Sequence, residues 1–240
     1  MKRSVLLVMS GLLAASCCKA QETIIVTYSP RPPYHTPAPD GSPVGLTGTP
    51  AAAAFQAAGI AVTWAILPTN RQLAMVKDRR ARSCSIGWFR TPGRERYAKF
   101  TKPIYRDKAW LVLARADYNV PDGVTLELML QSPAAHLLVK DNFSYGPEID
   151  AMLARLRPST AVSTGGTEQM LQSLRAGAAD FLFISEDEGG YLMAQGGERA
   201  KRFKLLRPGG MPRGEERHIM CGMSVPDEVI AQLNKAITFK

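Results

Sequence analysis

The sequence has few cysteines and histidines, and beyond its N-terminal region it has no long apolar run. No segment after residue 20 reaches about eighteen consecutive apolar residues, so we expect no membrane-spanning helix. The histidines His35, His136 and His218 are scattered without zinc-ligand spacing, which argues against a metal site. The net charge of +9 at pH 7 contains no long run of like charges, so nucleic acid is not an expected partner.

Signatures of catalysis are also missing. No nucleophile elbow, zinc signature or phosphate-binding loop is present, so catalysis has little positive support and no cofactor is expected. What remains is an ordinary globular composition, with 45% hydrophobic and 21% charged residues in 240 positions. A chain of this length buries a large core, either as one large domain or as two smaller lobes.

The N-terminal residues 1–20 have the pattern of a secretory signal peptide. A basic Met-Lys-Arg start is followed by an apolar stretch over residues 5–15, and residues 18–20 offer small side chains where a signal peptidase reads them. Two alternatives remain: a buried N-terminal helix, and a lipoprotein whose loose lipobox ends at Cys17. We expect an exported, periplasmic protein that begins at Gln21 after cleavage.

Export changes how the cysteines are interpreted. Cys17 and Cys18 belong to the signal region, which leaves Cys84 and Cys221 in the mature chain. In an oxidising compartment, one such pair is a candidate disulfide between distant parts of the sequence. The alternative is two buried free thiols that never meet, since each cysteine lies in a strand-like run.

Short buried strands alternate with helices along the chain. The expected strands cover residues 23–28, 60–64, 83–89, 109–114, 136–140, 161–163, 180–185 and 218–225. The expected helices cover residues 51–58, 147–156 and 167–176, with two more that begin near residues 69 and 226. This alternation predicts an α/β fold. Turn-like stretches at residues 115–117 and 207–210 indicate two boundaries.

Several short motifs occur together between residues 22 and 237. Thr91-Pro92-Gly93-Arg94 precedes Phe100-Thr101-Lys102-Pro103-Ile104-Tyr105. Weaker pieces are Pro32-Pro33-Tyr34, Asp40-Gly41 followed by Gly45-Leu46, and the pattern Leu-x-x-Gly-x-x-Asp over residues 174–180. Together these motifs resemble those of the type II periplasmic solute-binding proteins of the polar amino-acid class, the bacterial extracellular family 3.

The resemblance implies a two-lobed α/β fold with two crossovers and a ligand cleft between the lobes. Lobe 1 is expected to comprise residues 21–114 and 208–240, and lobe 2 residues 115–207, in agreement with the boundaries that composition marks. The same division places Cys84 and Cys221 in one lobe, which favours the disulfide. We expect the protein to be a monomer.

The resemblance also implies ligand-binding residues. The arginine of the family motif forms a bidentate pair with a ligand carboxylate, and by position it is Arg94, assisted by Thr91. Ser144 and Tyr145 stand at a helix start, where backbone N–H groups favour an anion. The plainer alternatives are a solvated surface arginine and an ordinary N-cap. Aromatic walls of the cleft, with a purely core role as the alternative, are expected from Tyr34 and Trp88.

Some positions depart from the family pattern. Tyr28 and Ser185 stand where amino-acid binders usually have an Asp that faces the ligand ammonium, and Arg31 stands where an aromatic platform is common. The loss of these carboxylates, with the gain of Arg31 and Arg90, shifts the expected ligand toward anions. The run Glu186-Asp187-Glu188, with Glu186 as its first member, is a candidate amine partner, and an exposed acidic helix start is the alternative.

These observations favour a receptor that delivers a small anionic or zwitterionic solute with a carboxylate to an ABC permease. One alternative is a periplasmic enzyme on the same fold, similar to prephenate or arogenate dehydratases, for which Glu186 is the candidate general acid. The other alternative is a sensor or accessory subunit that uses its lobes for contact with another protein.

Overall fold

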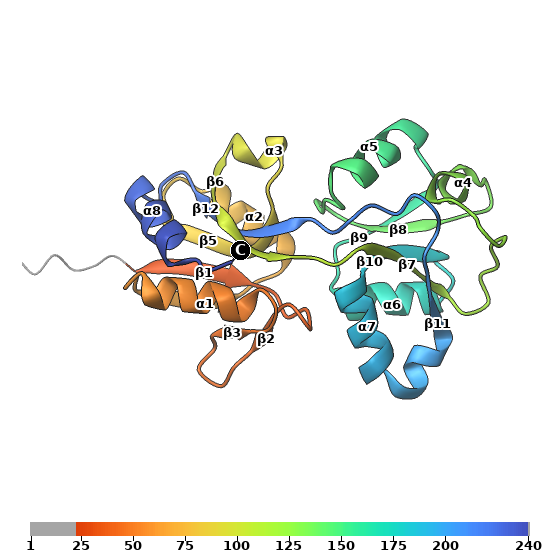
Figure 1. Ribbon diagram of the computed structural model, residues 1–240, viewed down its shortest axis with the longest axis horizontal. Coiled ribbons are helices and arrows are strands. Elements are labelled where there is room, and N and C mark those ends of the chain that lie inside the picture. The colour runs from red at the N-terminus through yellow and green to blue at the C-terminus, as the bar shows by residue number, and fades with distance from the viewer. Residues whose placement is uncertain (1–22, 240) are drawn as a thin grey trace, which may run out of the picture.

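The computed structural model of the chain describes residues 23–239. The expected signal peptide over residues 1–20 and the lipobox-like stretch that ends at Cys17 lie outside the described residues. Within the described part, no helix is both long enough and apolar enough to cross a membrane. The strands and helices form two lobes that are joined by two connecting segments (Figure 1).

The first lobe is built on a five-stranded sheet in the order β4-β1-β5-β12-β6. Its strands are β1 (Ile24–Tyr28), β4 (Val62–Ile66), β5 (Ser83–Phe89), β6 (Ala98–Arg106) and β12 (Glu216–Gly222). Its helices are α1 (Gly48–Ala57), α2 (Thr69–Lys77), α3 (Pro92–Glu95) and α8 (Asp227–Ala236), and a small hairpin joins β2 (Thr36–Pro37) to β3 (Pro43–Val44). Strand β1 runs parallel to β4 and β5, whereas β12 runs antiparallel to β5 and β6.

The second lobe has its own five-stranded sheet, in the order β11-β7-β10-β8-β9. Its strands are β7 (Trp110–Arg115), β8 (Leu137–Lys140), β9 (Thr160–Ser163), β10 (Phe181–Ser185) and β11 (Phe203–Leu206). Its helices are α4 (Leu126–Gln131), α5 (Pro147–Leu156), α6 (Thr167–Arg175), α7 (Glu186–Gln195) and the 3-10 helix η1 (Gly197–Arg202). The α/β, two-lobed fold expected from the sequence is confirmed.

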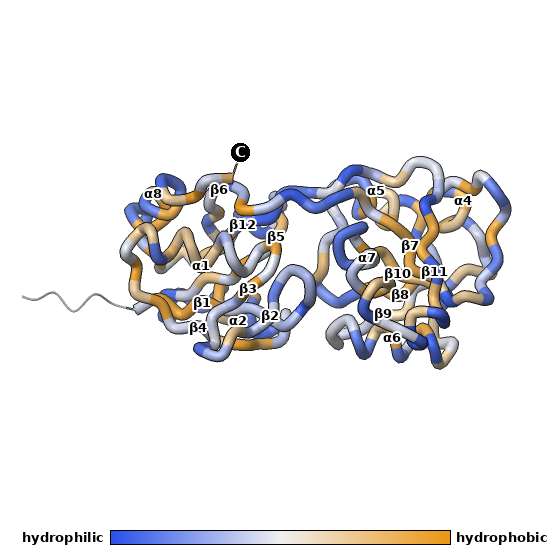
Figure 2. The backbone as a smooth tube through the Cα atoms, turned by 60° about the horizontal axis from the view of Figure 1, so that its bottom comes forward, coloured by the Kyte–Doolittle hydropathy of each residue, from blue (hydrophilic) through white to orange (hydrophobic). Residues whose placement is uncertain are grey.

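The alternating directions of the apolar side chains along β7 explain why helices cover both faces of the second sheet. Trp110 and Val112 point into a core that includes α4 and α5, whereas Leu111 and Leu113 point into a core that includes α6. Successive side chains of a strand face opposite sides, so a strand apolar at every position needs helices on both. Apolar residues therefore gather inside each lobe, while the connecting segments are hydrophilic (Figure 2).

The two connecting segments, residues 107–109 and 207–215, run side by side between the sheets. The Asp107 N–H donates to the Glu215 carbonyl at 3.0 Å, and the Trp110 N–H donates to the Pro212 carbonyl at 3.3 Å. The first crossing therefore lies before β7, whereas the sequence placed it after residue 114. The polar turn that suggested the later boundary lies at the far end of β7, where Arg115 forms ion pairs with Asp117 and Asp180.

The disulfide between Cys84 and Cys221 joins neighbouring strands β5 and β12 of the first lobe. Both cysteines are fully buried in the core that α1 and α8 cover. The last strand and helix of the chain are thereby linked to the N-terminal part of the same lobe. The disulfide expected from the sequence is confirmed, and the free-thiol alternative is not.

Candidate functional site

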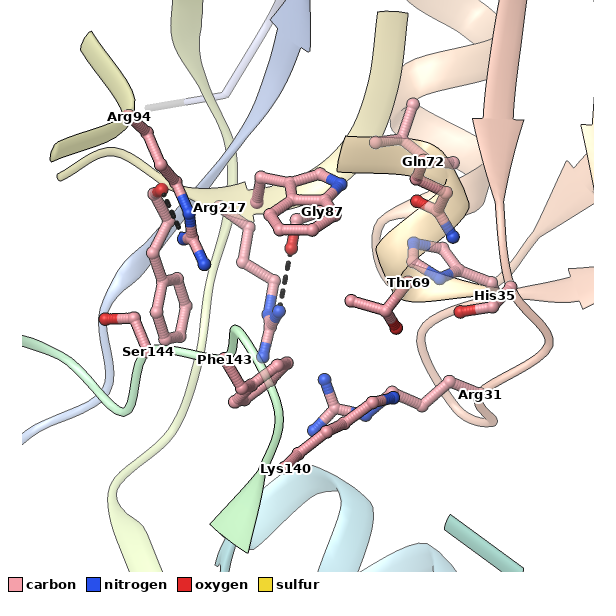
Figure 3. Close-up of a pocket in the computed structure, with 14 residues that line it drawn as sticks. Arg31, His35, Thr69, Gln72, Gly87, Arg94, Lys140, Phe143, Ser144 and Arg217 are labelled. Atoms are coloured by element: carbon pink, nitrogen blue, oxygen red, sulfur yellow. Dashed lines mark hydrogen bonds between the residues drawn. The ribbon is translucent and has the colours of Figure 1, made fainter. Parts of the chain in front are cut away.

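A cavity of about 40 Å³ lies between the two lobes (Figure 3). The first lobe contributes side chains from the loop after β1 and from α2, β5, α3 and β12, and the second lobe contributes the end of β8 and the loop that follows it. The lining residues are Ser29, Arg31, His35, Thr69, Gln72, Ile86, Gly87, Trp88, Phe89, Arg94, Lys140, Phe143, Ser144 and Arg217. Four of them are cationic and none is a carboxylate. The net charge that the lining presents to a ligand therefore depends on which of these four cations are paired with carboxylates that do not themselves line the cavity.

Arg217, on β12, is held by the buried carboxylate of Asp107. Its Nε and Nη2 atoms donate to the two Asp107 oxygens at 2.6 Å each. Its Nη1 donates to the Gly87 carbonyl at 2.8 Å, as Figure 3 shows. The guanidinium also stacks on the rings of Tyr34 and Phe89. Burial is the largest single influence and opposes its charge, but Asp107 and Tyr34 together outweigh it and raise the pKa of Arg217 above its ordinary value. Arg217 is thus a neutralised, fixed part of the wall.

Arg31, in the loop after β1, reaches across to the second lobe and pairs with Glu188 of α7. Its Nε and Nη2 donate to the two carboxylate oxygens at 3.0 and 2.6 Å, and Thr167 donates to the first of these oxygens at 2.8 Å. Its guanidinium lies over the rings of Tyr34 and Phe143. Burial disfavours both charges, but their mutual attraction lowers the pKa of Glu188 and raises that of Arg31. We call this pair the interlobe ion pair.

Other contacts hold the lobes together around the cavity. The hydroxyls of Tyr34 and Ser185 are 2.6 Å apart. At a second point the Asn70 amide donates to the Asp141 carboxylate at 2.8 Å. The arrangement is therefore a closed one, in which residues of both lobes share one set of hydrogen bonds.

Arg94, the arginine of the sequence motif, is 8% exposed and lies at the cavity. It belongs to α3, a short helix that begins with Pro92 and is capped by the Thr91 hydroxyl, which accepts from the Arg94 N–H at 3.3 Å. The guanidinium donates to the Phe89 and Asn142 carbonyls and lies over the Trp88 ring. Burial lowers the pKa of Arg94. Within residues 23–239, no carboxylate forms an ion pair with it.

Lys140 is the second cation at the cavity without an acidic partner among the described residues. It ends β8 in the second lobe, and its ammonium lies 5.9 Å from the centre of the Phe143 ring. Burial, together with the nearby charge of Arg31, lowers the pKa of Lys140 to about 8. The cavity therefore carries two unneutralised cations, one on each lobe, at neutral pH.

His35 brings a neutral polar group to the same cavity. Burial, with the charge of Arg217, lowers the pKa of His35 to about 3, so the ring is uncharged. Its Nε2 is 2.6 Å from the Thr47 hydroxyl, and its buried Nδ1 has no hydrogen-bond partner among residues 23–239. A Cβ at Gly87 would approach Nε2 to 2.9 Å, and Gly87 has φ +77° at an irregularity in the β5–β12 pairing. Gly87 therefore makes room for the ring.

The structure brings together only some of the residues that the sequence singled out. Arg31, Trp88, Arg94 and Ser144 line the cavity, whereas Tyr34 lies buried behind it and Thr91 caps α3. Tyr145 lies in the core of the second lobe, and its N–H and the Ser144 hydroxyl both donate to Asp150. Glu186 is away from the cavity, where its carboxylate accepts from Arg207.

Sequence reasoning missed three residues of the site or its support: His35, Lys140 and Arg217. It named Glu188 only as part of the acidic run over residues 186–188, and not as a partner of Arg31. Lys140 was recognised as the end of a strand, where side chains of an α/β sheet commonly meet a ligand. Glu188 stands three residues after the N-cap Ser185, whose hydroxyl accepts from its N–H at 3.1 Å. The partners of Glu188 and Arg217 are 157 and 110 residues away in the sequence, so no local pattern identifies them.

Comparisons with known proteins identify the architecture. No protein-family model matches the chain, and no curated protein matches its sequence. Among solved structures, an ancestral arginine-binding protein bound to arginine is 14% identical with a TM-score of 0.71, covering 90% of each chain. A substrate-binding protein of an amino acid ABC transporter is 13% identical with a TM-score of 0.67, covering 90% of this chain and 91% of that one.

A histidine kinase sensor domain with similarity to periplasmic binding proteins is equally near in shape. It is 16% identical with a TM-score of 0.69, covering 90% of this chain and 88% of that one. At sequence identities of 13–16%, structural similarity shows the fold and no more. The chain has the two-lobed fold of the type II periplasmic binding proteins.

Proposed function

We propose that the protein is an exported, periplasmic receptor that closes its lobes on a small carboxylate-bearing solute and presents it to an ABC importer. The observation that carries the proposal is the cavity between the lobes, which four cationic side chains and no carboxylate line. The paired donors of a guanidinium match the two oxygens of a carboxylate. Arg94 lines the cavity, and its guanidinium has no acidic partner in the described part of the chain. We therefore propose that Arg94 binds the carboxylate of the solute.

The connection between the lobes supports a receptor that opens and closes. Within residues 23–239, only residues 107–109 and 207–215 join the sheets, and they run side by side. Two short segments of this kind can absorb the change in dihedral angles that a hinge motion needs. An importer can read such a motion because the closed and open lobes present different surfaces. The solved structures of arginine-binding and ABC substrate-binding proteins with this fold are consistent with that role.

A thermal-shift screen tests the proposal. The mature protein is screened against amino acids, mono- and dicarboxylates, keto acids and aromatic acids. A solute at one hundred times its Kd stabilises by about 2.7 kcal/mol, which is about 5–10 °C for a chain of this size. We expect a shift that Arg94→Gln abolishes and that Arg96→Gln, an exposed position beside the same short helix, leaves intact. Equal shifts in both variants would remove Arg94 from the site.

The sensor remains a second candidate because a histidine kinase sensor domain has the same fold at similar coverage. Once a solute is known, deletion of the gene separates the two roles. An importer subunit predicts that uptake of the labelled solute is lost. A sensor predicts normal uptake and loss of a transcriptional response to the solute.

The dehydratase alternative loses its candidate general acid. Glu186 begins α7 and forms an ion pair with Arg207 at 2.8 Å, with its side chain 40% exposed. It does not line the cavity, and neither does any other carboxylate of the described residues. The solved structures with this fold that are described above are binding proteins and a sensor domain.

A further inference from the structure

We infer that the site takes a compact dianion without an amine, with one anionic group on Arg94 of the first lobe and the other on Lys140 of the second. This inference rests on the proposed function, because it names the class of solute that the receptor would capture. Three features of the cavity carry it: the balance of charge, the state of the nearby carboxylates, and the size of the space.

The balance of charge leaves two cations for the ligand. Asp107 neutralises Arg217 through two hydrogen bonds, and Glu188 neutralises Arg31 in the same manner. Arg94 and Lys140 line the same cavity and have no ion-pair partner within residues 23–239. Asp150 lies near Arg94, but its oxygens accept from the Ser144 hydroxyl and the Tyr145 N–H. A ligand with two negative charges would complete the balance across the lobes.

The nearby carboxylates are already paired with arginines of the protein. An ammonium in a closed cleft needs an acidic partner, because an unpaired buried cation is costly. Glu188 already accepts from two donors of Arg31 and from Thr167, and both oxygens of Asp107 accept from Arg217. An amino acid would thus add a fifth cation to a lining without carboxylates. This is the kind of mismatch by which a site rejects the wrong ligand.

The size and remaining polarity of the space restrict the dianion further. A cavity of about 40 Å³ is room for roughly three water molecules. Oxalate, malonate and the inorganic oxyanions are small enough for the space beside Arg94. Ser29, Arg31, Thr69 and Lys140 also line a wider neighbouring space of about 510 Å³ between the lobes, into which a longer ligand would extend. His35 also lines the space, and its uncharged ring does not change the charge balance. In Figure 3, Arg94 lies at the upper left and Lys140 at the lower centre, with Arg217 and Phe143 between them in this view.

Isothermal titration calorimetry at pH 7 tests the inference with oxalate, malonate, phosphate and sulfate as dianion probes. Acetate serves as the monoanion, and arginine and glutamine serve as amino acids. We expect at least one dianion to bind about ten to one hundred times more tightly than acetate, since one charged hydrogen-bonding group adds about 1.5–3 kcal/mol. The two organic and two inorganic probes show which source of dianion the site prefers.

Lys140→Gln is the diagnostic variant, and Lys201→Gln, with an exposed side chain in the same lobe, is its control. We expect Lys140→Gln to weaken dianion binding about tenfold more than it weakens acetate binding, and to melt no lower than the wild type. Unchanged dianion affinity in Lys140→Gln would overturn the inference. Arg94-dependent binding of an amino acid, with no dianion bound, would overturn it while the proposed function stands. No binding by any of these probes would overturn the inference, and the proposed function would fall as well only if the thermal-shift screen also found no solute.

Discussion

Removal of one partner of the interlobe ion pair is expected to open the lobes. Glu188→Gln keeps the shape of the side chain but leaves the buried guanidinium of Arg31 without a carboxylate, and their side chains are only 5% and 16% exposed. Breaking a buried ion pair costs about 3–5 kcal/mol. Arg31 regains water when the lobes separate, so this cost falls on the closed state. Since about 1.4 kcal/mol is a factor of ten, the ratio of closed to open molecules falls by about one hundredfold or more.

Small-angle X-ray scattering of the ligand-free protein measures this change. We expect a larger radius of gyration for Glu188→Gln than for the wild type, and the same increase for Arg31→Met. Glu198→Gln is the control, because Glu198 forms an ion pair with Lys201 on the surface of the same lobe, where such pairs contribute little. Scattering from Glu188→Gln that coincides with the wild-type profile would refute the view that the interlobe ion pair holds the lobes closed.

Three further predictions concern the disulfide, Gly87 and pH. Replacement of Cys84 and Cys221 by Ser removes a disulfide whose cysteines are 137 residues apart. The chain entropy that this link removes from the unfolded state is worth about 5 kcal/mol, so the melting temperature should fall by about 10–20 °C. An unchanged melting temperature in differential scanning calorimetry contradicts this. Gly87→Ala should lower the free energy of unfolding by about 1–2 kcal/mol and displace the His35 ring. Gly59 is the control, because it has a similar φ but nothing lies within 4 Å of an added Cβ. Gly59→Ala should therefore lose only the free energy that the backbone conformation costs. Equal loss of oxalate affinity in both glycine variants would exclude the displacement. Lys140, which faces Arg31, Glu188 and the Phe143 ring, has a pKa of about 8 and loses its charge above that pH. Calorimetric affinity for oxalate should therefore fall by up to about tenfold per pH unit above pH 8 with proton uptake on binding, and a flat profile contradicts the assignment.

The fold was accessible from the sequence because its signals are local. Apolar runs such as residues 180–185 end at polar positions, and the helix over residues 167–176 shows its inner face by spacing; the structure places β10 and α6 there. The first boundary between the lobes was predicted after residue 114, too far along the chain, because a polar turn and a hinge segment have similar compositions. Only the pairing of β7 with β10 and β11 shows that this strand belongs to the second sheet.

The site was predicted less completely because its partners are distant in the sequence. Arg94 stands in a short motif, and the structure places it at the cavity. That it binds a ligand carboxylate stays a prediction. The acidic run at the start of α7 was treated as one unit, yet Glu186 faces Arg207 at the surface while Glu188 is buried against Arg31. A difference of two positions on a helix turns a side chain by more than half a circle, so only the tertiary structure distinguishes these two acids.

The binding of a small anion between the lobes is the central claim, and a crystal structure of the mature protein grown with oxalate tests it most directly. The account predicts one carboxylate of oxalate against the Arg94 guanidinium and the other within hydrogen-bond distance of the Lys140 ammonium. Closed lobes with no oxalate at these two residues, at a saturating concentration, would contradict it.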